Sequence, residues 1–250
     1  MPSNMKAVFE DPGIICFQHC KNKVFSIKLL AKCPECQTEL NSDDAYKMMP
    51  FRLPYPFIKP HQHPCSIILR PTHGDFLNDY FNAMNLHIGL TTSNGTIIEF
   101  DQWGLHKTPT NQSDTSHWSQ SLIVETMTEP WYEHWDDILH KMEKTKDTKW
   151  TSAAYHEDTF NCYTFVLDFL QNLNYGTLSA AAQNRTTFCE RYIVPRTTAA
   201  GKYISLYRKI RDHGFYIHTN SACTAAAAAA AATATTAVAV ASNAIREGSD

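Results

Sequence analysis

The sequence has no uninterrupted apolar run of about 18 residues, apart from an alanine-rich stretch near its end that is too weakly apolar to be a good membrane span. We therefore expect no transmembrane segment. Residues 1–13 lack the apolar core of a secretory signal peptide, so we expect an intracellular protein, cytoplasmic or nuclear. The net charge of -3 is small, which gives no reason to expect binding to nucleic acid or to an anionic membrane.

The sequence is long and apolar enough to form a sizeable core, because 43% of its 250 residues are hydrophobic. We expect an α+β domain over residues 46–218, with helices packed on an antiparallel sheet. The expected strands are 65–71, a hairpin over 85–100, 119–126 and a short strand near 190–195. The expected helices are 128–144, one that starts at residue 162, and 198–212. Residues 222–250 begin as a patternless stretch of Ala, Thr and Val, so we expect a low-complexity, disordered tail there.

A cysteine-rich module is expected over residues 14–40. In an intracellular protein, cysteines are reduced or bind metal rather than form disulfides. Four of the eight cysteines stand here with the spacings C-x3-C and C-x2-C: Cys16, Cys20, Cys33 and Cys36. Two such pairs can hold one tetrahedral ion, so the spacing predicts one structural Zn in a zinc-ribbon-like module. Two alternatives stay open: His19 replaces Cys16 as a ligand, or the thiols are free.

Cys162 is the candidate nucleophile. It opens an apolar segment with helical spacing and follows Asp158 and Asn161, which are both good N-cap residues. A thiol in the first turn of a helix feels the positive end of the helix dipole, which favours the thiolate. His87, near the start of a predicted strand, is the candidate general base. The alternative for Cys162 is a buried structural thiol, the commonest role of a free cysteine.

The predicted hairpin also indicates which residue orients His87. Asn94-Gly95 is typical of a two-residue turn, and such a turn places His87 opposite Gln102. A side-chain oxygen at that position would hold the imidazole tautomer, as the third member of a catalytic triad does. Three other polar residues compete for this role: Glu99, Asp101 and His106.

Six segments of the chain resemble the makorin-2 opposite-strand protein family. They are CPEC, CSIILRPTHGDFL, NLHIGL, NCYTFVLDFL, YIVPRT and KYISLYRKIRDHGFYI. The likeness runs from about residue 14 to residue 218 and is spread over many segments, which makes it specific. It implies no particular reaction.

HIG at 87–89 and NCYTF at 161–165 also resemble circularly permuted papain-like proteins, which include the lecithin–retinol acyltransferase and PPPDE groups. In these proteins a strand-borne His precedes a helix-borne Cys. The resemblance implies a permuted papain-like fold and a thiol hydrolase or acyltransferase that acts on an acyl or peptide substrate. Cys162, His87 and Gln102 would then be the nucleophile, general base and orienting group. The competing hypothesis is a binding or scaffold protein that keeps this fold without turnover.

Overall fold

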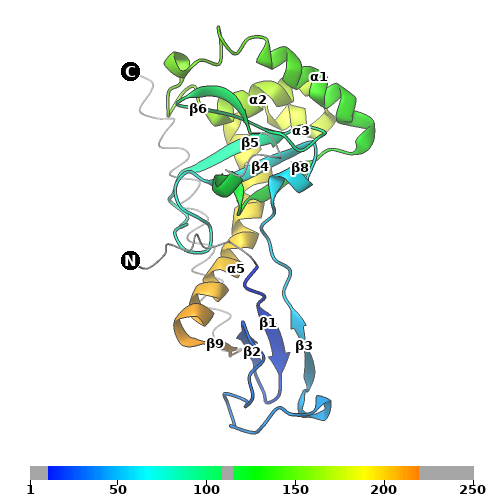
Figure 1. The fold of residues 1–250 in the computed structure, drawn as a ribbon, viewed down its shortest axis with the longest axis vertical. Helices are drawn as coiled ribbons and strands as arrows, with labels where there is room; N and C mark the ends of the chain where they lie inside the picture. The colour runs from blue at the N-terminus through cyan, green and yellow to red at the C-terminus, as the bar shows by residue number, and fades with distance from the viewer. Residues whose placement is uncertain (1–10, 109–114, 220–250) are drawn as a thin grey trace, which may run out of the picture. The chain divides into compact units, whose positions relative to one another are not determined.

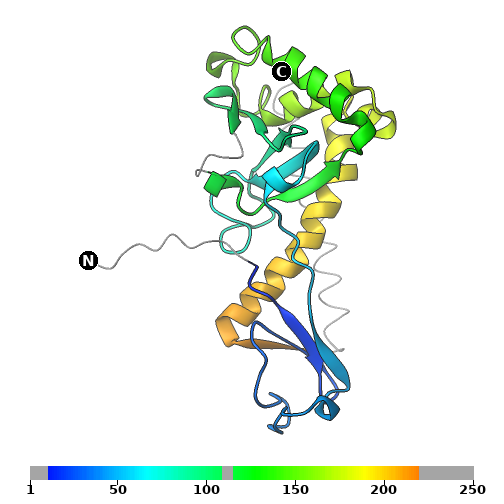
Figure 2. The ribbon, with the colours of Figure 1, turned by 45° about the vertical axis from the view of Figure 1, so that its right-hand side comes forward.

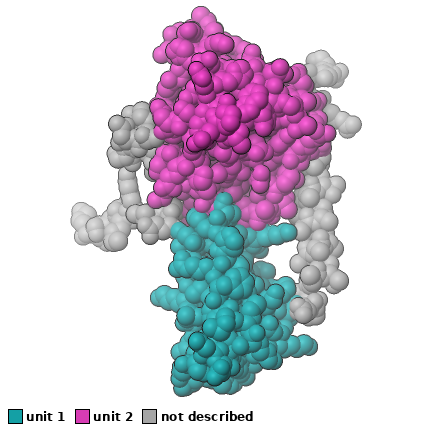
Figure 3. Space-filling model, turned by 90° about the vertical axis from the view of Figure 1, so that its right-hand side faces the viewer, with its two compact units in different colours: residues 1–56, 201–234 teal, residues 57–200, 235–250 magenta. Residues whose placement is uncertain are grey.

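A computed structural model of the chain describes residues 11–108 and 115–219. Its antiparallel sheets and helices confirm the predicted α+β class. No helix in these two ranges is long and apolar enough to cross a bilayer. The described residues form two compact units, drawn in different colours in Figure 3: unit 1 holds residues 11–56 and 201–219, and unit 2 holds residues 57–108 and 115–200.

Unit 2 is built on a five-stranded antiparallel sheet with the strand order β7-β6-β5-β4-β8 (Figure 1). Its strands are β4 Ser66–Pro71, β5 Leu86–Thr91, β6 Ile97–Asp101, β7 Gly104–Thr108 and β8 Leu122–Thr126. β4 is buried along almost its whole length, because it lies between β5 and β8. β4 and β8 confirm the strands expected over 65–71 and 119–126.

The α-helices are α1 Tyr132–Glu143, α2 Cys162–Leu173, α3 Gly176–Ala181, α4 Arg185–Phe188 and α5 Val194–His213. Short 3-10 turns of unit 2 are Pro60–Gln62, Thr115–Trp118, Glu129–Trp131 and Ser152–Ala154. The helix α2 contacts β5 and β6 through a buried apolar face. Trp135 of α1 meets the Phe169 ring of α2 at 4.5 Å between centroids, and its indole N–H donates to the carbonyl of Thr91 in β5. These contacts hold α2 against the strand that carries His87.

The segment expected as a strand near residues 190–195 is helical. Cys189–Ile193 form a π-helical turn, and α5 follows directly from Val194. The β-branched residues Ile193 and Val194 favour a strand locally. Helices flank the segment on both sides, however, and Ile193 is buried where the turn contacts β8.

Unit 1 is built on a four-stranded antiparallel sheet with the order β3-β1-β2-β9 (Figure 2). Its elements are β1 Ile15–Gln18, β2 Lys23–Ser26, the 3-10 turn Asp43–Ala45, β3 Met48–Arg52 and β9 Phe215–His218. Its core cluster consists of Phe17, Val24, Cys33 and Leu40, and Phe215 and Ile217 of β9 pack against it. The unit thus extends beyond the module expected over 14–40, because a strand from the other end of the described chain completes its sheet.

The β5–β6 hairpin differs by one residue from the two-residue turn expected at Asn94-Gly95. Thr91 pairs with Ile97 across the two strands, and the loop between them is closed by residues 92 and 96 around a three-residue turn, 93–95. Gly95 has φ +80°, as the last residue of such a loop requires. One extra loop residue shifts the strand register by one position, which exchanges the two faces of the strand.

Candidate functional site

Cys162 is the first residue of α2, and the residue before it caps the helix. The side-chain oxygen of Asn161 accepts hydrogen bonds from the backbone N–H groups of Tyr163 and Thr164 at 3.1 and 3.4 Å. The Thr164 hydroxyl accepts in turn from the N–H of Asn161 at 3.2 Å. This capping box fixes the first turn of the helix. The thiol therefore lies at a helix N-terminus, where the backbone dipoles favour a thiolate.

His87 lies in β5, the strand that α2 contacts, and its side chain is close enough to the Cys162 thiol for each group to shift the pKa of the other. The backbone N–H of Ile88, the next residue of β5, also helps to lower the pKa of this thiol. Cys162 and His87 are each only 5% exposed. The sheet and the helix packed on it thus bring together the two residues that the sequence singles out as nucleophile and base.

A buried carboxylate, that of Glu99 in β6, contacts the His87 ring. The His87 Nε2 atom lies 2.8 Å from Glu99 Oε2. Trp118 donates its indole N–H to Glu99 Oε1 at 3.1 Å, His106 Nε2 lies 3.4 Å from the same oxygen, and Arg70 Nη2 lies 3.7 Å from Oε2. Because donors surround both of its oxygens, Glu99 is held as an anion and fixes the orientation of the imidazole.

The residue that orients His87 is Glu99, so the expectation for Gln102 is corrected. Gln102 lies exposed in the turn between β6 and β7. The three-residue loop of the hairpin places Glu99 and Asp101, rather than Gln102, on the strand face that carries His87. Asp101 lies close as well, with its Oδ1 3.6 Å from the Nδ1 atom of His106. The three competing residues of the sequence therefore gather in one network.

Sequence reasoning does not single out Arg70 or Trp118, although both complete this network. The guanidinium carbon of Arg70 lies 4.9 Å from the centre of the Trp118 ring, and its Nη1 donates to the carbonyls of Pro71 and Thr72. A charged residue inside the apolar strand β4 is a signal that could have indicated Arg70. Trp118 stands in a 3-10 turn far from the other residues in sequence, and no pattern marks it.

The electrostatics of the pair favour a thiolate and an imidazolium. Burial alone would lower the pKa of His87, but the nearby Cys162 and the hydrogen bond with Glu99 raise that pKa to about 9. Burial would raise the pKa of Cys162, but the nearby, positively charged His87 holds it below its ordinary value of 9.0. Burial would also raise the pKa of Glu99, yet hydrogen bonds from His106 and His87 hold it far below its usual range. Both pKa values are thus shifted toward the charged forms, the thiolate of Cys162 and the imidazolium of His87.

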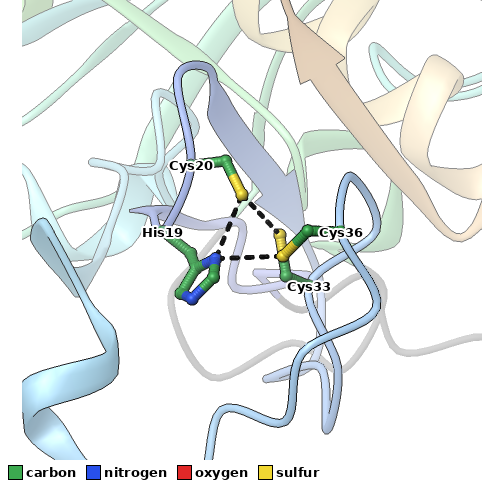
Figure 4. Close-up of side chains that lie close together, drawn as sticks. All are labelled: His19, Cys20, Cys33 and Cys36. Atoms are coloured by element: carbon green, nitrogen blue, oxygen red, sulfur yellow. Dashed lines mark hydrogen bonds between the residues drawn. The ribbon is translucent and has the colours of Figure 1, made fainter.

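A second group of side chains, in unit 1, has metal-ligand geometry (Figure 4). The Nδ1 atom of His19 lies 3.2 Å from Cys20 Sγ and 3.4 Å from Cys36 Sγ. The Sγ atoms of Cys20 and Cys33 lie 3.8 Å apart, and all four ligand atoms are within 4.8 Å of one another. Sulfur ligands bound at about 2.3 Å to one ion lie roughly 3.5–4 Å apart in a tetrahedron, so the four side chains fit one metal.

His19, rather than Cys16, completes this cluster, which corrects the all-cysteine ligand set. Cys16 lies inside β1, where it pairs with Phe25 and is 2% exposed. The strand ends at Gln18, so His19 and Cys20 follow it in the turn that faces the second cysteine pair. Cys16 is thus a buried core residue, and the cluster, which we call the Cys3His cluster, is the alternative that the sequence leaves open.

Glu99, Asp101 and His106 also offer three ligand atoms within 4.8 Å of one another. Glu99, however, already lies between the positively charged groups of His87 and Arg70. These cations repel a metal ion, so we assign the three residues to the ion-pair network around Glu99.

Comparison with known proteins identifies the family. The DUF4796 N-terminal family model matches residues 12–40, and the DUF4796 C-terminal family model matches residues 50–210. The MKRN2 opposite strand protein of Homo sapiens is 34% identical to the chain over 213 residues, which are 82% of this chain and 89% of that protein. No solved structure matches the chain. The matched segments extend over most of the two units, and the chain therefore belongs to the DUF4796 family, that of the makorin-2 opposite-strand protein.

Proposed function

We propose that the protein is a thiol-dependent hydrolase or acyltransferase, in which Cys162 is the nucleophile, His87 the acid and base, and Glu99 the orienting group. The thiolate attacks the carbonyl carbon of an acyl or peptide substrate and forms a tetrahedral intermediate. His87 gives its proton to the leaving group, which departs and leaves a thioester on Cys162. Water or an acceptor, deprotonated by His87, then attacks the thioester, and release of the acyl product restores the thiolate–imidazolium pair.

One observation carries this proposal: the buried Cys162 and His87 lie together where α2 contacts β5, and the Nε2 atom of His87 lies 2.8 Å from Glu99 Oε2. Burial alone would keep both the thiol and the imidazole neutral, yet both pKa values are shifted toward the charged forms. Shifts that oppose burial in this way are typical of an activated nucleophile and its base. A strand-borne His that precedes a Cys at the start of a packed helix also supports a permuted papain-like fold.

A binding or scaffold protein without turnover is the second candidate, and one observation favours it. Cys162 and His87 are each 5% exposed, so a substrate carbonyl reaches the sulfur only through local movement of the residues above it. The reactivity of the Cys162 thiol toward a small electrophile distinguishes the two candidates.

Iodoacetamide labelling, read peptide by peptide by mass spectrometry, tests the proposal. Near neutral pH, Cys162 should react faster than the more exposed Cys189, because burial raises the pKa of Cys189 to about 11. The midpoint of the pH profile for Cys162 should lie below 9.0, since its pKa is lowered. In the His87→Ala variant the midpoint should move upward, because the largest influence that opposes the effect of burial is then removed.

The internal control is Cys65, a buried thiol whose pKa is raised to about 12 by burial. Its slow labelling should be the same in the wild type and in the His87→Ala variant. If Cys162 reacts no faster than Cys65, or if the variant leaves the pH profile of Cys162 unchanged, the proposal fails and the scaffold candidate remains.

We also propose that the Cys3His cluster binds one structural zinc ion in a zinc-ribbon-like site. The distances among its ligand atoms and its sulfur and imidazole donors support zinc, which prefers four such ligands in a tetrahedron. Four protein ligands leave no open position for a substrate, so the ion would stabilise unit 1 rather than catalyse. The small apolar core of the unit supports this role, because small domains commonly need a metal or a disulfide to fold.

A further inference from the structure

Arg185, the first residue of α4, contacts the residues on both sides of Cys162. Its Nη2 atom donates to the side-chain oxygen of Asn161 at 3.3 Å, and its guanidinium carbon lies 4.9 Å from the centre of the Tyr163 ring. Its Nη1 atom donates to the backbone carbonyl of Asp158 at 3.2 Å. The guanidinium is therefore fixed beside the first turn of α2, next to the nucleophile.

The charge of Arg185 has no carboxylate partner among the residues that the structure describes. Its hydrogen-bond acceptors are an amide oxygen and a backbone carbonyl, and no ion pair within 11–108 and 115–219 includes it. Arg70, which also lies near this site, is by contrast paired with Glu99. A half-buried guanidinium with two neutral acceptors keeps N–H donors that a ligand can use.

We infer that Arg185 binds a carboxylate of the substrate while Cys162 attacks the substrate's carbonyl carbon, an inference that rests on the proposed function. A guanidinium presents a planar fork of donors that matches the two oxygens of a carboxylate. Asn161 and Tyr163 hold this fork in place beside the reacting sulfur. The substrate class is therefore an acyl or peptide compound that carries a carboxylate close to the bond that is cleaved.

The position of the charge supports this assignment. The positive charge of Arg185 contributes to the lowered pKa of Cys162. It also acts to lower the pKa of Tyr155, which burial and the charge of Cys162 together raise to about 12. The Cys162 thiol, the Arg185 guanidinium and the Tyr155 phenol thus lie in one region. Among the described residues, Arg185 has no carboxylate partner there.

Alkylation of Cys162 by iodoacetate and by iodoacetamide tests the inference, because the two reagents differ only in carrying a carboxylate or a neutral amide. The rate constant for iodoacetate divided by that for iodoacetamide should fall at least about fivefold in the Arg185→Gln variant. This variant removes the positive charge and keeps an N–H donor for Asn161. Arg185→Lys should keep part of the preference for iodoacetate. The ratio cancels any change in the thiolate content of Cys162, since both reagents attack the same thiolate.

Arg191→Gln is the matched control, because it removes the same charge from an exposed residue of the following turn and should leave the ratio unchanged. Melting temperatures show whether each variant is folded. If the ratio does not change in Arg185→Gln while Cys162 still reacts faster than Cys189 with iodoacetamide, the inference is overturned and the proposed function stands. If Cys162 reacts with neither reagent, both are overturned.

Discussion

At the scale of single residues, Glu99 links four neighbouring strands. Its carboxylate in β6 meets His87 of β5, Arg70 of β4 and His106 of β7. The Glu99 side chain is 7% exposed, so its charge is largely removed from water. A buried anion is tolerated only while its counter-charges are present, and the same holds for the cations around it. Changes at Glu99 should therefore affect both the fold of unit 2 and the state of the Cys162–His87 pair.

Replacement of Glu99 by Ala should lower the free energy of unfolding by about 3–5 kcal/mol, because it leaves His87 and Arg70 buried without a counter-charge. Glu99→Gln keeps the shape of the side chain and one acceptor oxygen, so it should lower the free energy of unfolding by less. It should also raise the pH midpoint for alkylation of Cys162, since Glu99 helps to hold a proton on His87. Urea unfolding and labelling measure the two effects. A Glu99→Ala variant within about 1 kcal/mol of the wild type would show that the network contributes little.

At the scale of secondary-structure elements, the β5–β6 hairpin depends on the conformation of Gly95. This residue has φ +80°, and a Cβ atom on it would collide with the backbone carbonyl of His61. The hairpin sets the register that brings Glu99 to the face of His87. A substitution at this loop should thus disturb the polar network as well as the turn.

Gly95→Ala should destabilise unit 2 by at least about 2 kcal/mol, from left-handed backbone strain and from the clash with His61 together. Gly214→Ala is the matched control: Gly214 also has φ +80°, but nothing lies within 4 Å of its Cβ position, so only the strain remains. Chemical denaturation of both variants gives the comparison. Equal losses of stability in Gly95→Ala and Gly214→Ala would mean that the backbone at His61 moves away from the new Cβ atom without a cost in free energy.

The Cys3His cluster predicts which cysteine substitutions release metal. After refolding with zinc and gel filtration, elemental analysis should find one zinc per chain in the wild type and in the Cys16→Ala variant. Cys36→Ser should lose most of the zinc, because it removes one of the four ligands. Loss of zinc by Cys16→Ala as well as by Cys36→Ser would instead favour the all-cysteine set, because Cys36 is a ligand in both sets.

The elements that the sequence predicts well are those decided by short-range chemistry. The start of α2 follows from the Asn161 cap and the apolar spacing that comes after it, so both Cys162 and its helix could be found. The existence of the β5–β6 hairpin follows from Asn94-Gly95 and the apolar strands on either side.

Other features depend on contacts that no local pattern contains. The hairpin loop is one residue longer than expected. The register therefore shifts by one position, and Glu99 rather than Gln102 becomes the partner of His87. The helical turn at Cys189–Ile193 overrides the strand preference of its β-branched residues, because the segment is fixed by flanking helices and by packing near β8. Geometry of this kind is set by tertiary structure.

At the scale of the whole molecule, unit 1 is assembled from two distant parts of the chain. β9 pairs with β2: His218 lies opposite Lys23 at one end of the pairing, and Phe215 lies opposite Ser26 at the other. Phe215 and Ile217 of this strand pack against the core that contains Phe17. No sequence pattern indicates such a pairing, since the two strands are separated by all of unit 2.

Deletion of residues 222–250, which lie outside the described residues, should change the stability by less than about 1 kcal/mol. A patternless segment buries too little apolar area to offset an ordering entropy of about 1–2 kcal/mol per residue. Deletion of residues 214–250 is the control, because it also removes β9 and the contacts of Phe215 and Ile217. It should destabilise unit 1 by about 2 kcal/mol or more. Equal melting temperatures for the two truncations would contradict the prediction.

The pairing of β9 with β2 also imposes an order on synthesis. The described residues of unit 2 precede β9 in the chain, so this unit can fold before the last described strand has left the ribosome. Unit 1 must wait, with β1 and β2 already made and the edge of β2 that later receives β9 still unpaired. A free strand edge is a template for pairing with another chain. The newly made protein therefore passes through an interval of exposure to aggregation that ends only when β9 docks.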